Sequence, residues 1–495
     1  MEISFESESL RYFERLYSGS STHEETTELI VPDALPDVGG VLSVEGSALL
    51  RGKEAGTDSL TVSGVCDLSI LYLPEEGGTL QRLSTEVPFS AVIPCPGLTE
   101  LGRAVVTLRL VSGEARLLNS RKLLVRTEVC VTAGVWLPRQ LEWNSACRTE
   151  DGIEVLSREY SLMPVTDVTE KTFSAGETLA MPGGRPEPEE VLSARVSLRT
   201  EEMNGVGSKL ILRGSARVGV FYLSARGEPA EAELQLPWSL ILELESEGAE
   251  QRCEVYTAVT GFRVSPAQEG GFLVELGAVA QAAVRRRVTL RCVADAYGIG
   301  NALETQVKTA ELETGGEILE SGDSLRLQLD AQKNVGRVVH ICTWLGRPRT
   351  EEGETRITLQ AKALCMGDNG SLTALSGRKE AVCPRETGQA LTAEAGEAYG
   401  SVNGQGVEVR VPVSYRCPRW EKGEVQMLTG AETVQESEPR EEQPAISVIL
   451  AREGDSVWSL GKANRASCAG IRQVNGMEAE EEPSPGSLIL VLRQR

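Results

Sequence analysis

The body of the chain repeats a strand-rich pattern at an offset of 150 residues. VPDALPDVGGVLS at residues 31–43 returns as MPGGRPEPEEVLS at residues 181–193. Further matches in or near this register are Gly64 with Gly214, Tyr72 with Tyr222, and Pro88-Phe89-Ser90 with Pro237-Trp238-Ser239, the last one residue short. Separate matches in one register indicate two copies of one structural unit.

A third copy is more divergent. Gly316-Glu317-Ile318-Leu319 resembles the start of the other copies, and RITLQAKALCM at residues 356–366 resembles their middle strand. Each copy also ends in a stretch typical of a β-hairpin, at residues 116–125, 263–274 and 401–411.

Strand periodicity dominates each copy. Apolar and polar residues nearly alternate around Gly64 in the first copy and around Gly214 in the second. A glycine inside such a pattern indicates a bulge or a close backbone approach. We therefore predict a mainly β protein built from tandem β-sandwich or barrel-like units, followed by a small α+β tail. The predicted organisation is a first unit at residues 1–150, a second at 151–300, a divergent third at 301–430, an acidic linker at 431–444 and the tail at 445–495.

The tail follows the order strand, helix, helix, strand. Ser456 and Ser467 can each cap a short helix, and Asn475-Gly476 can end the second one. The strands are predicted at residues 446–450 and 488–492, on either side of the two helices.

The tail resembles the LysM domain, a βααβ module that binds N-acetylglucosamine-containing glycans in many relatives. The matching pieces are GDSVWSL at 454–460, Ile471, Asn475 and PGSL at 485–488. Arg465 departs from the pattern, because glycine is common at that interhelical turn. The resemblance places a binding groove between two loops, which contain Gly454, Asp455, Ser456 and Val457, and then Asn475, Gly476 and Met477.

The body resembles the SPOCS domain, which is repeated in spore proteins. The resemblance rests on Val-Pro-Asp-x-x-Pro-Asp at 31–37 followed by Val-Leu-Ser, although the second copy has Gly183 and Glu187 in place of the aspartates. Tandem SPOCS domains before one LysM domain form the architecture of the SipL family. This implies an adaptor that binds the coat morphogenetic ATPase SpoIVA at the forespore surface, on its mother-cell side.

Composition narrows the classes of partner. The net charge of −22 argues against nucleic acid and anionic membrane surfaces, and it is compatible with a basic protein. No apolar stretch is long enough to span a membrane, and the N-terminus lacks the features of a signal peptide. Eleven cysteines without a Cys-x-x-Cys pair suggest buried free thiols and a reducing cytoplasm.

We expect no enzymatic activity, cofactor or metal. The two histidines, His23 and His340, stand alone, and His340 lies in an apolar run typical of a buried strand. GSALLRGK at 46–53 resembles a P-loop, but its glycines are one residue too far apart and Glu54 replaces the hydroxyl that would bind Mg²⁺.

Two functions remain open. In the first, the protein is a non-enzymatic assembly adaptor whose tail binds a protein and whose β domains associate with one another or with partners. In the second, it binds an N-acetylglucosamine-containing glycan such as peptidoglycan. Glu478, Glu480, Glu481 and Glu482 form an acidic rim beside the groove, which favours a basic protein surface. The alternative is that Asp455, Ser456 and Asn475 bind no ligand and serve only to cap helices and form turns. Trp458 is expected in the core of the tail.

Overall fold

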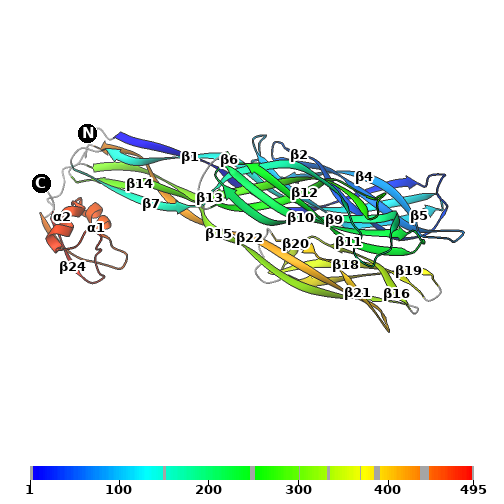
Figure 1. Ribbon diagram of the computed structural model, residues 1–495. Helices are drawn as coiled ribbons and strands as arrows, with labels where there is room; N and C mark the ends of the chain where they lie inside the picture. The colour runs from blue at the N-terminus through cyan, green and yellow to red at the C-terminus, as the bar shows by residue number, and fades with distance from the viewer. Residues whose placement is uncertain are drawn as a thin grey trace.

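The computed structural model describes residues 4–148, 152–245, 251–299, 302–331, 335–367, 370–383, 391–434 and 445–492. The chain is mainly β, as predicted, with two short helices near its C-terminal end. Figure 1 shows an elongated body of long strands with the small tail at one end.

The strands of the body fall into three successive sets, which we call the first, second and third units. The first contains β1 (Ser4–Ile30), β2 (Val38–Ala55), β3 (Ser59–Pro74), β4 (Gln81–Pro94), β5 (Arg103–Asn119) and β6 (Lys122–Arg148). The second contains β7 (Ile153–Leu162), β8 (Val165–Leu179), β9 (Pro188–Val206), β10 (Lys209–Ser224), β11 (Pro229–Glu243), β12 (Gln251–Pro266), β13 (Phe272–Arg286) and β14 (Val288–Gly298). The third contains β15 (Ala302–Asp330), β16 (Arg337–Leu345), β17 (Arg349–Glu351), β18 (Glu354–Met366), β19 (Leu372–Val382), β20 (Thr392–Ala395), β21 (Tyr399–Asn403) and β22 (Gly406–Val434).

Each unit is a sandwich of two antiparallel layers, and β1 and β8 join one layer of the first unit to one of the second in a single six-stranded sheet. One layer of each unit is a meander, with order β2-β3-β4, β9-β10-β11 or β16-β18-β19. The other is a hairpin whose second arm pairs back with an earlier strand, giving β1 with β6, β8 with β13 and β15 with β22. Each unit buries its own cluster of apolar side chains between the two sheets. The predicted limits of the units stay a prediction.

The residues that match between the first two copies perform the same tasks. The phenol of Tyr72 donates to the carbonyl of Pro36 at 3.1 Å, and that of Tyr222 donates to the carbonyl of Pro186 at 2.8 Å. Both rings are fully buried. This hydrogen bond ties the middle strand of each meander to the proline-containing loop that precedes the meander's first strand. Proline and tyrosine therefore recur together.

The same β-bulge occurs in the first meander strand of all three units. The strand pairing skips Leu42 in β2, Leu192 in β9 and Val339 in β16. A bulge leaves one residue unpaired and redirects its side chain. These three side chains meet in one buried cluster, so the bulges bring the units together.

The start of the third unit differs from the prediction. Gly316 to Leu319 lie inside β15, where Gly316 is opposite Trp420. The counterpart of Val-Leu-Ser is Val338-Val339-His340 on β16. The sequence match was misleading because this glycine is needed for another reason. Gly316 has a φ of +142° at an irregular point of a long ladder, where the neighbouring backbone approaches closely, and it does not begin a meander.

The linker also begins later than predicted. Ala431 to Val434 continue β22 and pair with Ala302 to Thr305, because the long ladder of the third unit extends that far. Residues 435–444 of the predicted linker lie outside the described residues.

Long ladders extend from the sandwiches toward the tail and form what we call the stalk. These ladders are β1–β6, β7–β14 and β15–β22. Apolar side chains from all three meet between them, namely Leu141, Trp143, Leu162, Leu290, Cys292, Leu312, Val425 and Met427. The stalk is therefore built by all three units together.

A buried ion cluster fixes the base of the stalk. Arg285 is fully buried and donates to Glu254 and Glu313, each at 2.6 Å. Arg15 of the first unit also contacts Glu254 at 2.5 Å, and the Trp420 ring lies 3.6 Å from the Arg285 guanidinium carbon. Burying these charges is tolerable only because each has a partner of opposite sign.

Gly64 and Gly214 face an aromatic ring on the neighbouring strand. A Cβ at Gly64 would lie 2.5 Å from Phe89, and one at Gly214 would lie 2.1 Å from the carbonyl oxygen of Arg199 and 2.6 Å from Trp238. The rings cover the glycines, which is why Pro-Phe-Ser and Pro-Trp-Ser recur opposite them.

Replacing either glycine by alanine should destabilise its unit. We expect Gly64→Ala and Gly214→Ala each to lower the free energy of unfolding by roughly 1–3 kcal/mol, because the added methyl group overpacks a filled site. Gly261→Ala is the control, since a Cβ there meets nothing within 4 Å. Equal stability of all three variants in denaturant unfolding would refute this account of the glycines.

Candidate functional site

The tail folds with the predicted order of elements, β23 (Ile446–Leu450), α1 (Val457–Asn464), α2 (Cys468–Asn475) and β24 (Leu488–Leu492). Ser456 caps α1 in a reciprocal capping box with Ser459, and Ser467 caps α2. A small apolar core lies between the helices and one face of the two-stranded sheet. The cap positions derived from the sequence are confirmed.

The first predicted groove loop is a tight turn. Gly454 has a φ of +89°, and the Asp455 carboxylate accepts a hydrogen bond from the Arg452 amide at 2.7 Å. Ser456 is the cap of α1, and the side chain of Val457 is fully buried in the core. The polar side chains of this loop, Asp455 and Ser456, therefore form hydrogen bonds that shape the turn and cap the helix.

The second predicted loop is held by Asn475. Its side-chain amide donates to the carbonyls of Ile471 and Leu490 and accepts from the Leu490 amide, all within 2.8 Å. Gly476 closes α2 with a φ of +66°, and Met477 packs against the core. Asn475 thus joins α2 to β24. Whether these seven residues bind a ligand stays a prediction.

Glu482 connects the first predicted groove loop to α2. One carboxylate oxygen accepts from the Val457 amide at 2.6 Å, and the other accepts from Arg472 at 3.2 Å. The carboxylate therefore takes up the hydrogen-bonding capacity of a backbone amide in the first predicted groove loop. This amide is at the N-terminus of α1, where the helix dipole favours negative charge. The sequence analysis placed Glu482 in the outer acidic rim. Its contact with Val457 could not be foreseen, because the two residues are 25 positions apart in the chain.

The prediction that Trp458 belongs to the core of the tail is wrong. Its indole N–H donates to Asp295 at 3.1 Å, and its ring lies 4.8 Å from the ring of Tyr297. Both partners belong to β14 of the stalk. The helical position of Trp458 points toward the stalk because Val457 and Leu460 already fill the core side of α1.

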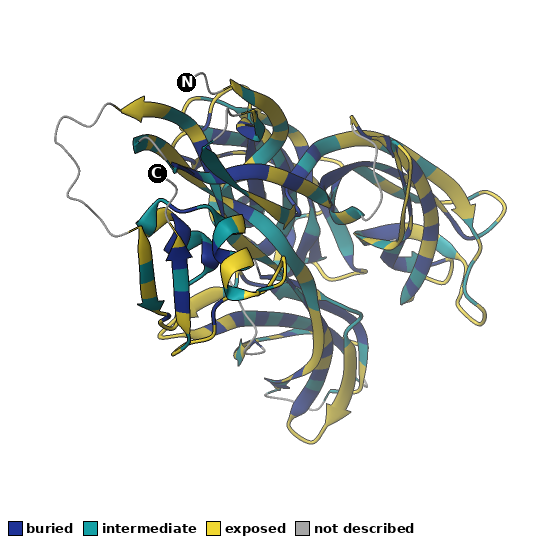
Figure 2. Ribbon diagram, turned by 90° about the vertical axis from the view of Figure 1, so that its left-hand side faces the viewer, coloured by how far each residue is buried: buried dark blue, intermediate teal, exposed yellow. Residues whose placement is uncertain are grey.

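Further contacts hold the helices of the tail against the stalk. Lys462 forms an ion pair with Asp295 at 2.6 Å, and the Tyr297 hydroxyl donates to the carbonyl of Ala466 at 2.7 Å. The Cys468 amide donates to Glu154 of β7 at 3.2 Å. Figure 2 shows the two helices toward the strands of the stalk and the two strands of the tail on the other side.

Gly461 allows this close packing. A Cβ at Gly461 would lie 2.4 Å from the Tyr297 hydroxyl oxygen and 3.0 Å from the carbonyl oxygen of Ala466. Because Tyr297 is fixed by its hydrogen bond to Ala466, the helix would have to move away to accept a side chain.

We expect Gly461→Ala to loosen the tail from the stalk in the full chain. Alanine favours the helix by up to about 1 kcal/mol, so loss of the contact would come from the clash with Tyr297 and not from helix propensity. Hydrogen exchange should become faster in α1 while β23 and β24 keep their protection. Gly470→Ala is the control, because its Cβ would make only an ordinary 3.7 Å contact. Unchanged exchange in α1 would contradict the docked arrangement.

A second group of polar side chains lies where the three units meet, and we call it the junction. Glu45 of β2 accepts hydrogen bonds from Ser43 at 2.7 Å, from Ser193 of β9 at 2.6 Å and from His340 of β16 at 2.9 Å. The other ring nitrogen of His340 contacts Glu231 of β11. One buried carboxylate thus bonds to side chains from all three units.

The residues of the junction follow from the common bulge. Ser43, Ser193 and His340 each come directly after the bulged residue, and Glu45, Arg195 and Cys342 follow two positions later on the same face of their strands. Aligning VLSVE, VLSAR and VVHIC in the sequence could have revealed this set. Starting the third copy at Gly316–Leu319 concealed this alignment.

Charge pairing at the junction changes the acidities of its groups. Burial alone would raise the pKa of Glu45, but the His340 cation and three hydrogen bonds outweigh it and lower the pKa to about 2. Burial alone would lower the pKa of His340, but Glu45, Cys342 and Glu231 raise it well above its usual value. The Phe221 ring stacks on the imidazole at 4.2 Å. His340 is therefore a buried cation at neutral pH, confirming that it serves as a satisfied strand residue.

Glu45, His340 and Cys342 place potential metal-ligand atoms within 4.8 Å of one another. Both ring nitrogens of His340 already contact carboxylates, so a metal ion would have to displace one of these bonds. Burial raises the pKa of the Cys342 thiol, with Glu45 adding to the effect, which opposes its ionisation. The arrangement therefore fits an ion pair better than a metal centre.

The stability of the junction should depend on pH. Because the folded pKa of His340 exceeds its unfolded value of about 6.5, its stabilisation is complete below that pH and is lost as pH rises through the folded pKa. Glu45 contributes in the opposite sense, with stabilisation lost as pH falls from about 4.5 toward about 2. Glu231 and Cys342 also face this histidine, and Arg195 lies near Glu231 and Glu45.

We expect His340→Gln to lower the free energy of unfolding by roughly 3–5 kcal/mol at pH 7, since it leaves a buried carboxylate unpaired. The difference from the unchanged protein should shrink as pH rises. His23→Gln is the control, because His23 lies partly exposed beside Glu25. A difference that stays constant from pH 7 to pH 10 would contradict a charged His340.

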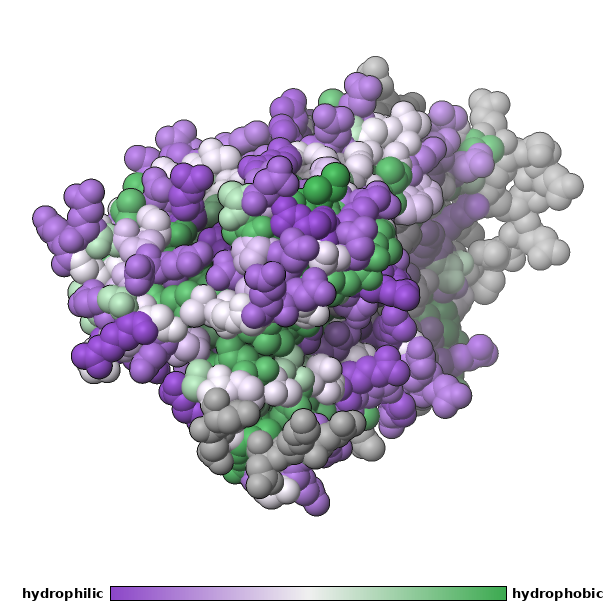
Figure 3. Space-filling view, turned by 90° about the vertical axis from the view of Figure 1, so that its right-hand side faces the viewer, coloured by the Kyte–Doolittle hydropathy of each residue, from purple (hydrophilic) through white to green (hydrophobic). Residues whose placement is uncertain are grey.

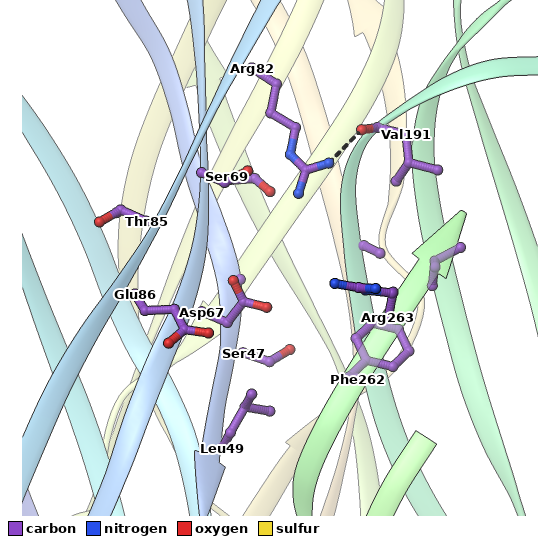
Figure 4. Close-up of a pocket in the computed structure, with 14 residues that line it drawn as sticks. Ser47, Leu49, Asp67, Ser69, Arg82, Thr85, Glu86, Val191, Phe262 and Arg263 are labelled. Carbon is purple, nitrogen blue, oxygen red and sulfur yellow. Dashed lines mark hydrogen bonds between the residues drawn. The ribbon is translucent and has the colours of Figure 1, made fainter. Parts of the chain in front are cut away.

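A cavity of about 380 Å³ lies between the first and second units (Figure 4). Asp67 and Glu86 are on one wall, and Arg263 and Phe262 are on the other, while Arg82 donates to the carbonyl of Val191 at 3.0 Å. Burial and the nearby Glu86 raise the pKa of Asp67. Gly46 of the P-loop-like stretch also lines this space, but the whole stretch lies inside β2.

Residues 37–116 match the protein family described as SipL, SPOCS domain. This stretch runs from the start of β2 almost to the end of β5 and includes the first-unit residues of the junction. The match assigns a sporulation-related, SipL-like domain to the first unit. No curated protein and no solved structure matches the chain.

Two further expectations can be compared with the structure. None of the eleven cysteines, all within the described residues, is in a disulfide, and most of them, including Cys66, Cys130 and Cys365, are buried as the sequence suggested. Within the residues that the structure describes, neither helix is long and apolar enough to cross a bilayer.

Proposed function

We propose that the protein is a non-enzymatic adaptor in spore-coat assembly. Its three β units form a scaffold of SPOCS-type domains, and its LysM-like tail binds a coat morphogenetic ATPase at the forespore surface. The observation that carries the proposal is the SPOCS match at residues 37–116, since it connects the chain with sporulation independently of the tail.

The geometry of the tail supports a protein partner over a glycan. An acetamido group would need free backbone amides in the groove loops, but the Val457 amide already donates to Glu482. Asn475 likewise uses its side-chain amide and oxygen within the tail. A glycan would have to compete with these internal hydrogen bonds, whereas a protein surface can use the whole exterior of the tail.

The exposed carboxylates favour a basic partner surface. Glu453, Glu478 and Glu480 are exposed on the loops of the tail. Charges at the edge of an interface mainly speed association with a surface of opposite sign and are screened by salt. N-acetylglucosamine-containing glycan remains the second candidate, supported by the βααβ order of the tail and its two loops.

Reversal of the rim charges should weaken binding of the purified ATPase to the full-length protein. We expect Glu478→Lys with Glu480→Lys to slow association several-fold and to flatten its dependence on salt. Glu481 and Glu482 are left unchanged because each accepts a backbone hydrogen bond. Glu75→Lys with Glu76→Lys, two exposed residues at the β3–β4 turn, supplies the charge-matched control.

The same protein should be tested against chitin oligomers and peptidoglycan. The proposal expects binding of the ATPase and none of these glycans at comparable concentrations. Tight glycan binding without ATPase binding would reverse the order of the two candidates.

A further inference from the structure

The two-stranded sheet of the tail is apolar on both faces. Its inner face, with Ile449, Ile489 and Val491, packs on the core beneath the helices. The opposite face, which we call the outer face, consists of three cross-strand pairs, Ile446 with Leu492, Val448 with Leu490 and Leu450 with Leu488. Val448 is 61% exposed and Leu488 is 69% exposed.

This pattern differs from that of an ordinary solvated sheet. An antiparallel sheet with one covered face usually alternates apolar and polar residues, whereas uninterrupted aliphatic strands are typical of sheets covered on both sides. Six aliphatic side chains gathered on one face of so small a module mark an interaction site. Within the described residues, the stalk contacts the helices and leaves the outer face uncovered (Figure 2).

In Figure 3, which views the end of the molecule opposite the tail, hydrophilic side chains cover most of the visible surface and hydrophobic ones gather near its middle. The outer face of the tail, by contrast, belongs to a sheet whose core lies on its other side.

We propose that the outer face binds an amphipathic helix of the partner protein, with an aliphatic stripe flanked by lysine or arginine. This inference rests on the proposed function, because it names the surface through which the tail would hold its partner. A flat face two strands wide offers side chains rather than backbone groups, so it suits the i, i+3, i+4, i+7 stripe of a helix. A strand added at the edge would leave the aliphatic side chains exposed.

The charges beside the face define the polar part of that helix. Glu453 is three residues after Leu450, and the loop that carries the exposed Glu478 and Glu480 enters β24 at Leu488, opposite Leu450. Basic residues beside the aliphatic stripe would complement them.

Two other occupants fit less well. A second copy of the chain would bring together two proteins that each carry a net charge of −22. Residues 431–444 are rich in glutamate and contain no leucine, isoleucine or aromatic residue, so their composition does not match an aliphatic face.

The test replaces Val448 and Leu488 by threonine in the full-length protein. Threonine keeps the preference for a strand while removing part of the apolar contact. Val92→Thr with Val206→Thr is the matched control, because both valines are 63% exposed on strands of the body. Binding of the purified ATPase is measured for each protein, its thermal unfolding is compared, and cross-linking with mass spectrometry locates the contacted segment.

We expect the Val448→Thr, Leu488→Thr protein to bind about tenfold more weakly or worse, with the control protein unchanged. The cross-links should join β23 or β24 to a basic amphipathic helix. Equal binding by all proteins would overturn the inference while leaving the proposed function in place. Failure of the unchanged protein to bind would overturn both. A dimer of the unchanged protein that these substitutions convert to a monomer would assign the face to a second copy and overturn the choice of partner.

Discussion

The pairing of one buried carboxylate determines how the three units fit together. A charge in a protein interior destabilises the fold unless partners of opposite sign and hydrogen-bond donors surround it. Glu45 has such partners only when β2, β9 and β16 converge, because Ser43, Ser193 and His340 each supply one of them. Removing any unit would leave the carboxylate incompletely satisfied. The junction therefore favours one arrangement of three sandwiches over the many that apolar contact alone would allow.

The remaining architecture extends this arrangement toward the tail. Once the sandwiches are fixed, their long ladders run side by side and share the apolar core of the stalk. The end of the stalk then offers Asp295 and Tyr297 as a platform for α1. Because the helices of the tail face the stalk, its sheet faces outward. A scaffold of this kind would hold a binding module in a defined orientation, which is what an assembly adaptor requires.

Sequence reasoning reached the parts of the fold that depend on local pattern. Repeated glycines, tyrosines and prolines identified equivalent strands because a repeat is found by comparing the chain with itself. The serine caps of the tail were located correctly because a cap depends on neighbours in sequence. The role of Trp458 was missed, since helical periodicity distinguishes an apolar face from a polar one but does not show which partner covers it. The inward contact of Glu482 and the carboxylate partners of His340 were missed for the same reason. Their partners are in distant segments, and no periodicity reveals a contact of that kind.

Hydrogen exchange of the full-length protein at neutral pH tests most directly whether the junction unites the three units. The central amides of β2, β9 and β16 can be followed separately in one experiment. If the units depend on a shared buried ion pair, the slowest amides of all three strands should open with the same free energy, close to that of global unfolding. Exchange of β16 at a much lower free energy than β2 and β9 would show that the third unit opens alone, and it would contradict the account.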